Sequence, residues 1–331
     1  MRRRVFIATI GSIALAISFD AFAQRQSGQM RKVGLLMETH ESDPVAQQQM
    51  MNFRSTLATL GWVNGRDISL EIRWYSGEST RANQYARVLV DLAPDVIVVT
   101  STMGLEAARS ATREIPIVFV NVTDPVGARY VESLAKPGGN ITGFSSFDAE
   151  TGGKWLEIIK EAVPAVNRVG VLMDPEYAGY MARWRAMETL GPSFKVELSM
   201  VAIRASADIE NAIATFAREP NSALIVFSSA ITSANRNLII DLVARHRLPT
   251  IYPFKNFTER GGLISYGIDP LDIFQRAASY ADRILRGTSL GELPVQAPTK
   301  FELVINAKTA KALGLTIPPS QESRAVLAPQ C

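Results

Sequence analysis

Short apolar runs alternate with longer amphipathic segments along most of the chain. The runs PDVIVVT (94–100) and PIVFVN (116–121) are continuous and rich in β-branched residues, which is typical of parallel strands buried on both faces. Segments such as STRANQYARVLVDLA (79–93) space their apolar residues as a helix does. This alternation predicts an α/β fold built on a doubly wound parallel sheet.

The same alternation restarts in the second half, where RVGVLMD (168–174) resembles KVGLLM (32–37) in character. We therefore expect two similar lobes, each opening with a strand and a helix. The predicted boundaries are residues 31–143 plus 254–290 for lobe 1 and 144–253 plus 295–325 for lobe 2. The chain should cross between the lobes three times, near residues 141–147, 250–255 and 295–303.

The strand PIVFVN runs directly into the polar stretch NVTDPVGARYVESLAKPGG. Asp124 followed by Pro125 has the pattern of an N-cap and first helical residue, so a helix is predicted over residues 125–135. Gly138 and Gly139 then fit a turn at the helix end.

The first residues, MRRRVFIATIGSIALAISFDAFAQ, combine a basic start, an apolar stretch and an Ala-Phe-Ala site. This pattern predicts a secretory signal peptide over residues 1–23, with cleavage after Ala23, exported by the Sec or the twin-arginine route. A membrane anchor is the alternative, although the apolar run is shorter than a spanning helix needs. The expected location is the periplasm.

Charge and cysteine content exclude several classes of partner. Without the predicted leader the formal charge falls from +3 to +1, so no basic surface for nucleic acid or an anionic membrane is predicted. Cys331 is the only cysteine and the last residue, which leaves no disulfide framework and no lipid-anchor cysteine after the cleavage site.

No catalytic, metal-binding or nucleotide-binding motif is present, and we expect neither an enzyme nor a cofactor. His246 falls in the last turn of a predicted helix, where a cation is favoured. His40 follows the first strand, at a position suited to a ligand site, but no partner nucleophile is apparent.

Polar residues cluster after the predicted strands, where open α/β sheets bind ligands. Ser101, Thr102 and Asp124 can equally be helix caps, and the two roles can coexist. The candidate ligand-binding residues at these strand ends are Glu38, Thr39, His40, Ser101, Thr102, Asn121, Thr123, Asp124, Asp174 and Ser228.

Aromatic residues near the predicted crossings suggest apolar walls for an amphipathic small molecule. Phe147, Tyr252 and Phe254 are the candidates, with Tyr266 nearby, and core packing is the alternative for each.

Two blocks give the chain a family likeness. DPVGA…SLAKPGGNITG (124–143) and PTKFELVIN…AKALGLTIP (298–318) resemble the substrate-binding proteins of ABC transporters, specifically the TrpX-like group that includes receptors for tryptophan and tyrosine. The likeness extends from about residue 31 to residue 320.

The resemblance implies the type I periplasmic-binding-protein fold, with two Rossmann-like lobes joined by three crossovers. It also implies a monomer that traps a small solute by hinge closure and delivers it to an inner-membrane ABC permease driven by a separate ATPase. If the solute is an amino acid, Asp124 would bind its ammonium group and Ser101 with Thr102 its carboxylate.

Other functions use the same kind of pocket. A periplasmic sensing module for a membrane receptor would bind its ligand in the same way, and the sequence does not separate the two. A hydrolase is disfavoured because no activated nucleophile is visible. A repressor is disfavoured by the export signal and by the lack of an N-terminal helix-turn-helix.

Overall fold

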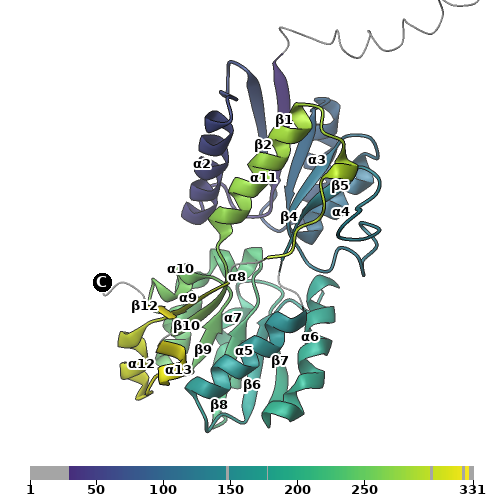
Figure 1. The fold of residues 1–331 in the computed structure, drawn as a ribbon. Helices are drawn as coiled ribbons and strands as arrows, with labels where there is room; N and C mark the ends of the chain where they lie inside the picture. The colour runs from purple at the N-terminus through teal and green to yellow at the C-terminus, as the bar shows by residue number, and fades with distance from the viewer. Residues whose placement is uncertain (1–29, 147–148, 177, 299–300, 323–324, 328–331) are drawn as a thin grey trace, which may run out of the picture.

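The computed structural model describes residues 30–146, 149–176, 178–298, 301–322 and 325–327. The predicted signal peptide and Phe147 lie outside the described residues. Two lobes are stacked end to end, each built on its own β-sheet (Figure 1). The prediction of two α/β lobes is confirmed.

Lobe 1 contains a five-stranded parallel sheet in the order β2-β1-β3-β4-β5. Its strands are β1 (Arg31–Met37), β2 (Ile68–Trp74), β3 (Val96–Thr100), β4 (Ile117–Val122) and β5 (Ile141–Ser145). Its helices are α2 (Pro44–Thr59), α3 (Ser79–Asp91), α4 (Ser101–Ala111) and α11 (Pro270–Leu285).

Strand β3 shows why this sheet has helices on both faces. Val96 and Val98 pack into the core that contains residues of α2 and α11, whereas Ile97 and Val99 pack with residues of α3 and α4. Successive side chains of a strand point to opposite faces, so an uninterrupted apolar strand requires a layer of helices on each side.

Lobe 2 contains a seven-stranded sheet in the order β12-β11-β10-β9-β8-β6-β7, parallel except where β10 meets β11. Its strands are β6 (Arg168–Met173), β7 (Glu197–Ala202), β8 (Ser222–Val226), β9 (Thr250–Tyr252), β10 (Ile264–Ile268), β11 (Phe301–Ile305) and β12 (Ala325–Leu327). Its α-helices are α5 (Ala149–Ala162), α6 (Ala178–Leu190), α7 (Asp208–Phe216), α8 (Ala230–Ala234), α9 (Arg236–Arg245), α10 (Lys255–Thr258), α12 (Ala307–Leu313) and α13 (Pro319–Glu322). Two short 3-10 helices, Gly191–Phe194 in lobe 2 and Leu290–Glu292 beyond α11, complete the described elements.

The chain passes from lobe 2 back to lobe 1 at Asp269, later than the predicted crossing at 250–255. The reason is that β10 pairs with β9 and β11 in the lobe 2 sheet, so residues 254–268 belong to lobe 2. Asp269 then caps α11, accepting a hydrogen bond from Leu271 N at 2.9 Å. The predicted return of this helix to lobe 1 is confirmed, because α11 packs against α2 and β4.

The helix predicted over residues 125–135 is wrong. The segment forms consecutive turns: Ala128 N donates to Asp124 O at 3.0 Å, and Arg129 has a φ of 57°. Val131 and Pro125 are buried while most of the segment is exposed, so a helix here would have little apolar surface to bury.

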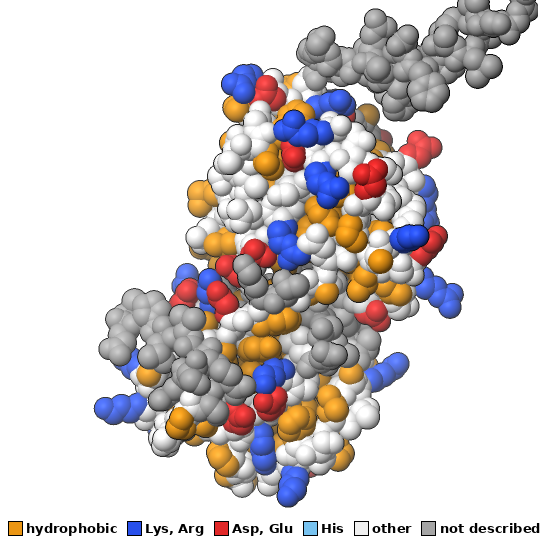
Figure 2. All heavy atoms as spheres, viewed as in Figure 1, with side chains coloured by type: hydrophobic (Ala, Val, Ile, Leu, Met, Phe, Trp, Pro, Cys, Tyr) orange, Lys and Arg blue, Asp and Glu red, His pale blue; other side chains and the backbone are white. Residues whose placement is uncertain are grey.

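Charged side chains of both signs are interspersed over the face of the two lobes shown in Figure 2. Among the described residues, no helix has the length and apolar character required to cross a membrane.

Candidate functional site

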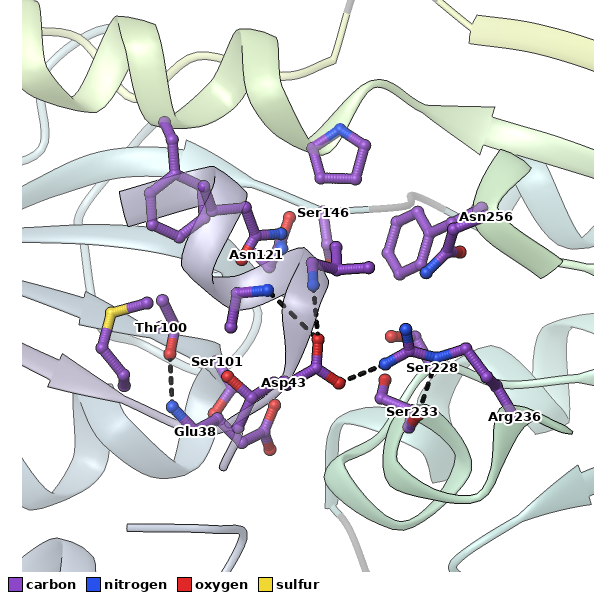
Figure 3. Close-up of a pocket in the computed structure, with 18 of the residues that line it drawn as sticks. Glu38, Asp43, Thr100, Ser101, Asn121, Ser146, Ser228, Ser233, Arg236 and Asn256 are labelled. Carbon is purple, nitrogen blue, oxygen red and sulfur yellow. Dashed lines mark hydrogen bonds and ion pairs between the residues drawn. The ribbon is translucent and has the colours of Figure 1, made fainter. Parts of the chain in front are cut away.

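A cavity of about 100 Å³ lies between the lobes and is lined by residues of both. On the lobe 1 side, the lining comes mainly from the carboxyl ends of β1, β3 and β4 and from the start of α2. On the lobe 2 side it comes from α6, from residues following β8 and from those around α10. Figure 3 labels Ser228, Ser233, Arg236 and Asn256 on this side. This is the edge at which parallel sheets bind ligands.

The fold brings about half of the predicted site residues to this cavity. Besides Glu38, the predicted residues that line it are Thr39, Ser101, Asn121, Thr123, Ser228 and Phe254. All lie at or shortly after the carboxyl end of a strand. All but Phe254, which was predicted as an aromatic residue near a crossing, were predicted from the direction of the strands.

Three other predicted residues lie outside the lining. His40 is exposed and interacts with Ser42 through Nδ1 and Oγ at 2.8 Å. Asp124 is also exposed, and its Oδ1 accepts a hydrogen bond from Gly127 N at 2.9 Å. It therefore stabilises a turn, as the capping alternative supposed, although no helix follows. Asp174 is half-buried, and its Oδ1 accepts a hydrogen bond from Glu176 N at 2.9 Å.

Two further candidates are buried rather than presented to the cavity. Tyr252 is fully buried and stacks on Phe257 with ring centroids 4.9 Å apart, which is the core-packing alternative; burial also raises the pKa of its hydroxyl. Thr102 is 6% exposed within α4 and does not line the cavity. Tyr266 stacks on Phe301, 5.4 Å away, outside the cavity.

Ser101 and Asn121 have left-handed backbones, with φ of 68° and 60°. Such a conformation is costly for residues other than glycine and is often found at functional sites. Ser101 Oγ lies 2.8 Å from the hydroxyl of Tyr75, which itself donates to Thr100 O at 3.0 Å. This network fixes the turn from β3 into α4 at the cavity wall.

Glu38 is the first residue after β1 and its side chain lines the cavity. Its backbone N–H donates to Thr100 Oγ1 at 2.7 Å. Loss of solvent around the carboxyl group raises its pKa to about 7, and the adjacent Ser101 hydroxyl acts in the opposite direction. Glu38 is therefore an acid that titrates near neutral pH at the edge of the site.

An ion pair joins the two lobes across the cavity. Asp43 lies at the start of α2 in lobe 1 and Arg236 at the start of α9 in lobe 2; their side chains are only 9% and 8% exposed. Asp43 Oδ1 accepts from Val45 N at 2.8 Å and Ala46 N at 3.1 Å, while Oδ2 binds Arg236. Arg236 Nε also donates to Ser233 O at 2.9 Å.

Arg183 supplies a second cation from α6. It is 3% exposed, and its guanidinium carbon lies 5.8 Å from the ring centroid of Trp155 and 5.2 Å from that of Phe227. Its Nη2 donates to Thr123 Oγ1 across the lobes at 3.4 Å. Cation–π contacts with aromatic rings stabilise a guanidinium that is buried away from water.

Three side-chain oxygen atoms of the lining are buried and form no hydrogen bond with any described residue. They are Thr39 Oγ1, Asn121 Oδ1 and Asn256 Oδ1. Buried polar groups normally have partners, so their clustering around one cavity indicates a site that a polar ligand or water completes. Tyr180, Phe254 and Phe274 give the same cavity an aromatic component.

Sequence reasoning missed Asp43, Arg183, Ser146, Arg236 and Asn256, all of which line the cavity. Asp43 precedes a proline at a helix start and has the ordinary pattern of an N-cap. Arg183 and Arg236 could have been found only as charges among the apolar positions of their helices, and the opposing lobe that buries them is not visible locally.

Comparisons with known proteins agree with this architecture. Residues 40–327 match the family described as ABC transporter substrate binding protein. A curated relative, the tyrosine-binding protein of Clostridioides difficile (strain R20291), is 28% identical over 278 residues, covering 82% of this chain and 78% of the relative.

Two solved structures are similar over 91% of this chain and 100% of their own length. A conserved domain protein from Vibrio cholerae has a TM-score of 0.84 at 29% identity. An ABC domain in complex with L-Trp, from Streptococcus pneumonia, has a TM-score of 0.83 at 23% identity. The predicted type I periplasmic-binding-protein fold is confirmed, and the chain belongs to the family of ABC transporter substrate binding proteins.

Proposed function

We propose that this protein captures an amino acid with an aromatic side chain between its two lobes and delivers it to an ABC permease. The observation that carries the proposal is the composition of the interlobe cavity. Polar strand ends with unpaired atoms (Thr39, Asn121) share it with aromatic rings (Phe254, Phe274). The tyrosine-binding relative and the neighbour solved with L-Trp support this ligand class.

Closure of the lobes is the conformational step. A ligand shifts the open–closed equilibrium only by binding the closed state better than the open state, so it must contact both lobes. The cavity meets this requirement because lobe 1 contributes Asn121 and Ser101 while lobe 2 contributes Arg183 and Phe254. Removal of contacts from either lobe should therefore weaken binding.

The family and the pattern of the first residues support a proposal for the cellular setting. We propose that the chain is exported to the periplasm by its N-terminal signal, is cleaved after Ala23, and works as a monomer with a permease powered by a separate ATPase. Mass measurement of the protein isolated from the periplasm should give a chain that begins at Gln24. A retained N-terminal segment would instead indicate a membrane anchor.

A ligand screen tests the function. The mature protein is heated with each of the twenty amino acids, with aromatic acids and with sugars, because a ligand that binds only the native state raises Tm. Tryptophan, tyrosine or phenylalanine should raise Tm most, and calorimetry should give one site per chain. Substituting Phe254→Ala should weaken this binding, whereas Tyr266→Ala, an aromatic change outside the cavity, should not. Stabilisation by sugars alone would refute the proposal.

A further inference from the structure

The acidic groups of the cavity are unequally available to a ligand. Among the described lining residues only Asp43 and Glu38 are acidic. Both carboxylate oxygens of Asp43 are already engaged, one by the first turn of α2 and the other by Arg236. Glu38 forms no ion pair with any described residue. It is therefore the acid left to meet a charge on a ligand.

Unpartnered side-chain oxygens line the same cavity as Glu38. Thr39 comes from the same strand end, and Asn121 from the end of β4; Oγ1 of the former and Oδ1 of the latter form no hydrogen bond with a described residue. An ammonium group has three N–H donors and no acceptor. A carboxylate that shares a cavity with unpartnered hydroxyl and amide oxygens offers acceptors to such a donor group.

We propose that Glu38 binds a protonated amine of the ligand and thereby selects amines over the corresponding deaminated acids. The proposal rests on the proposed function in that the ligand occupies the same interlobe cavity. Glu38 takes the role that the sequence analysis gave to Asp124, because Asp124 is exposed and lies outside the lining.

Binding should depend on pH with a defined sign. The Glu38 pKa of about 7 means that the carboxyl group holds its proton in weakly acidic solution and must release it to pair with an ammonium. The other charged groups of the cavity are Asp43 with its partner Arg236, and Arg183 on α6; Ser101 and Thr100 face Glu38 with hydroxyls. Affinity should fall as pH is lowered below 7, by up to tenfold per unit.

The experiment compares matched ligands on matched variants. L-tryptophan and L-tyrosine are titrated beside indole-3-propionate and 3-(4-hydroxyphenyl)propionate, which lack only the amine. The proteins are wild type, Glu38→Gln and the control Glu41→Gln, an identical change at an exposed position nearby. Loss of a charge-assisted hydrogen bond should weaken amino-acid binding by about 10- to 100-fold in Glu38→Gln. The control should retain wild-type affinity, and binding of the deaminated acids should change little.

The outcomes separate this inference from the proposed function. If aromatic amino acids bind and Glu38→Gln does not discriminate between the paired ligands, the inference is wrong and the function stands. If a different amine binds with the same dependence on Glu38, the function is wrong and the inference stands. Ligands without an amine as the only binders would overturn both. If Glu38→Gln folds poorly, the selectivity of the wild-type protein between paired ligands, and the pH profile of that selectivity, test the inference without the variant.

Discussion

At the scale of single residues, Ser101 combines a hydroxyl at the cavity with a left-handed backbone. Its φ of 68° brings a Cβ into a conformation that costs about 1–2 kcal/mol, while its Oγ is held 2.8 Å from the Tyr75 hydroxyl. The position could accept glycine without backbone strain. Serine instead keeps a hydroxyl that bonds Tyr75 and lines the cavity, so it can contribute both to the turn and to ligand binding.

Two substitutions of Ser101 should separate these contributions. Ser101→Gly should be more stable than Ser101→Ala by about 1 kcal/mol, because only glycine relieves the positive φ. Both variants should lose ligand affinity to a similar degree, since both lack the hydroxyl. Urea unfolding gives the stabilities and calorimetry the affinities. Equal stability of the two variants would show that the turn is not strained.

The same scale shows where sequence reasoning succeeds and where it stops. Strand direction predicts that Ser101 and Asn121 reach the ligand edge, and both do. Asp124 also follows a strand, but it is exposed, whereas Thr123, the residue directly before it, lines the cavity. Arg183 depends on a wall built by residues distant in sequence, Trp155 and Phe227, so no local pattern could predict its role.

At the scale of elements, helix α2 begins with a residue that serves two purposes. Asp43 caps the helix with Oδ1 and pairs with Arg236 through Oδ2. The boundary of α2 was predictable from Asp43 and Pro44, whereas the ion pair was not. In contrast, Asp124 and Pro125 present the same dipeptide and no helix follows, because the segment after them lacks a continuous apolar face.

Substitutions of Asp43 should resolve the two purposes. Asp43→Asn retains an oxygen that can cap α2, so its stability should exceed that of Asp43→Ala by about 1 kcal/mol. In both variants the equilibrium between the lobes should shift toward the open form, because neither carries the charge that pairs with Arg236. Thermal unfolding reports the first effect and ligand affinity the second. If Asp43→Asn were no more stable than Asp43→Ala, the cap would be unimportant.

At the scale of the whole molecule, the Asp43–Arg236 pair spans the two lobes. Burial of both side chains requires the lobes to be together, and separation would return them to water. Removal of one partner leaves the other charge uncompensated in the closed form, which costs several kcal/mol for buried pairs. The pair therefore contributes to the balance between open and closed forms.

Arg236→Met should shift this balance toward the open form. Without ligand, small-angle scattering should give a larger radius of gyration than for wild type, and saturating ligand should reduce the difference. Arg245→Met, at an exposed arginine of the same helix, is the matched control and should scatter as wild type does. An unchanged radius of gyration in Arg236→Met would mean that other contacts govern closure.

The start of α11 has a consequence for how such a receptor could report its cargo. Asp269 marks the passage between the lobes, and Pro270 and Phe274, within the next turn and a half, line the cavity. A solute held in this cavity would therefore contact the start of α11, next to the passage between the lobes, as well as the lobes themselves. A larger solute would hold the two lobes at a different angle. The surface that the protein presents to its permease would then differ with the size of the bound solute.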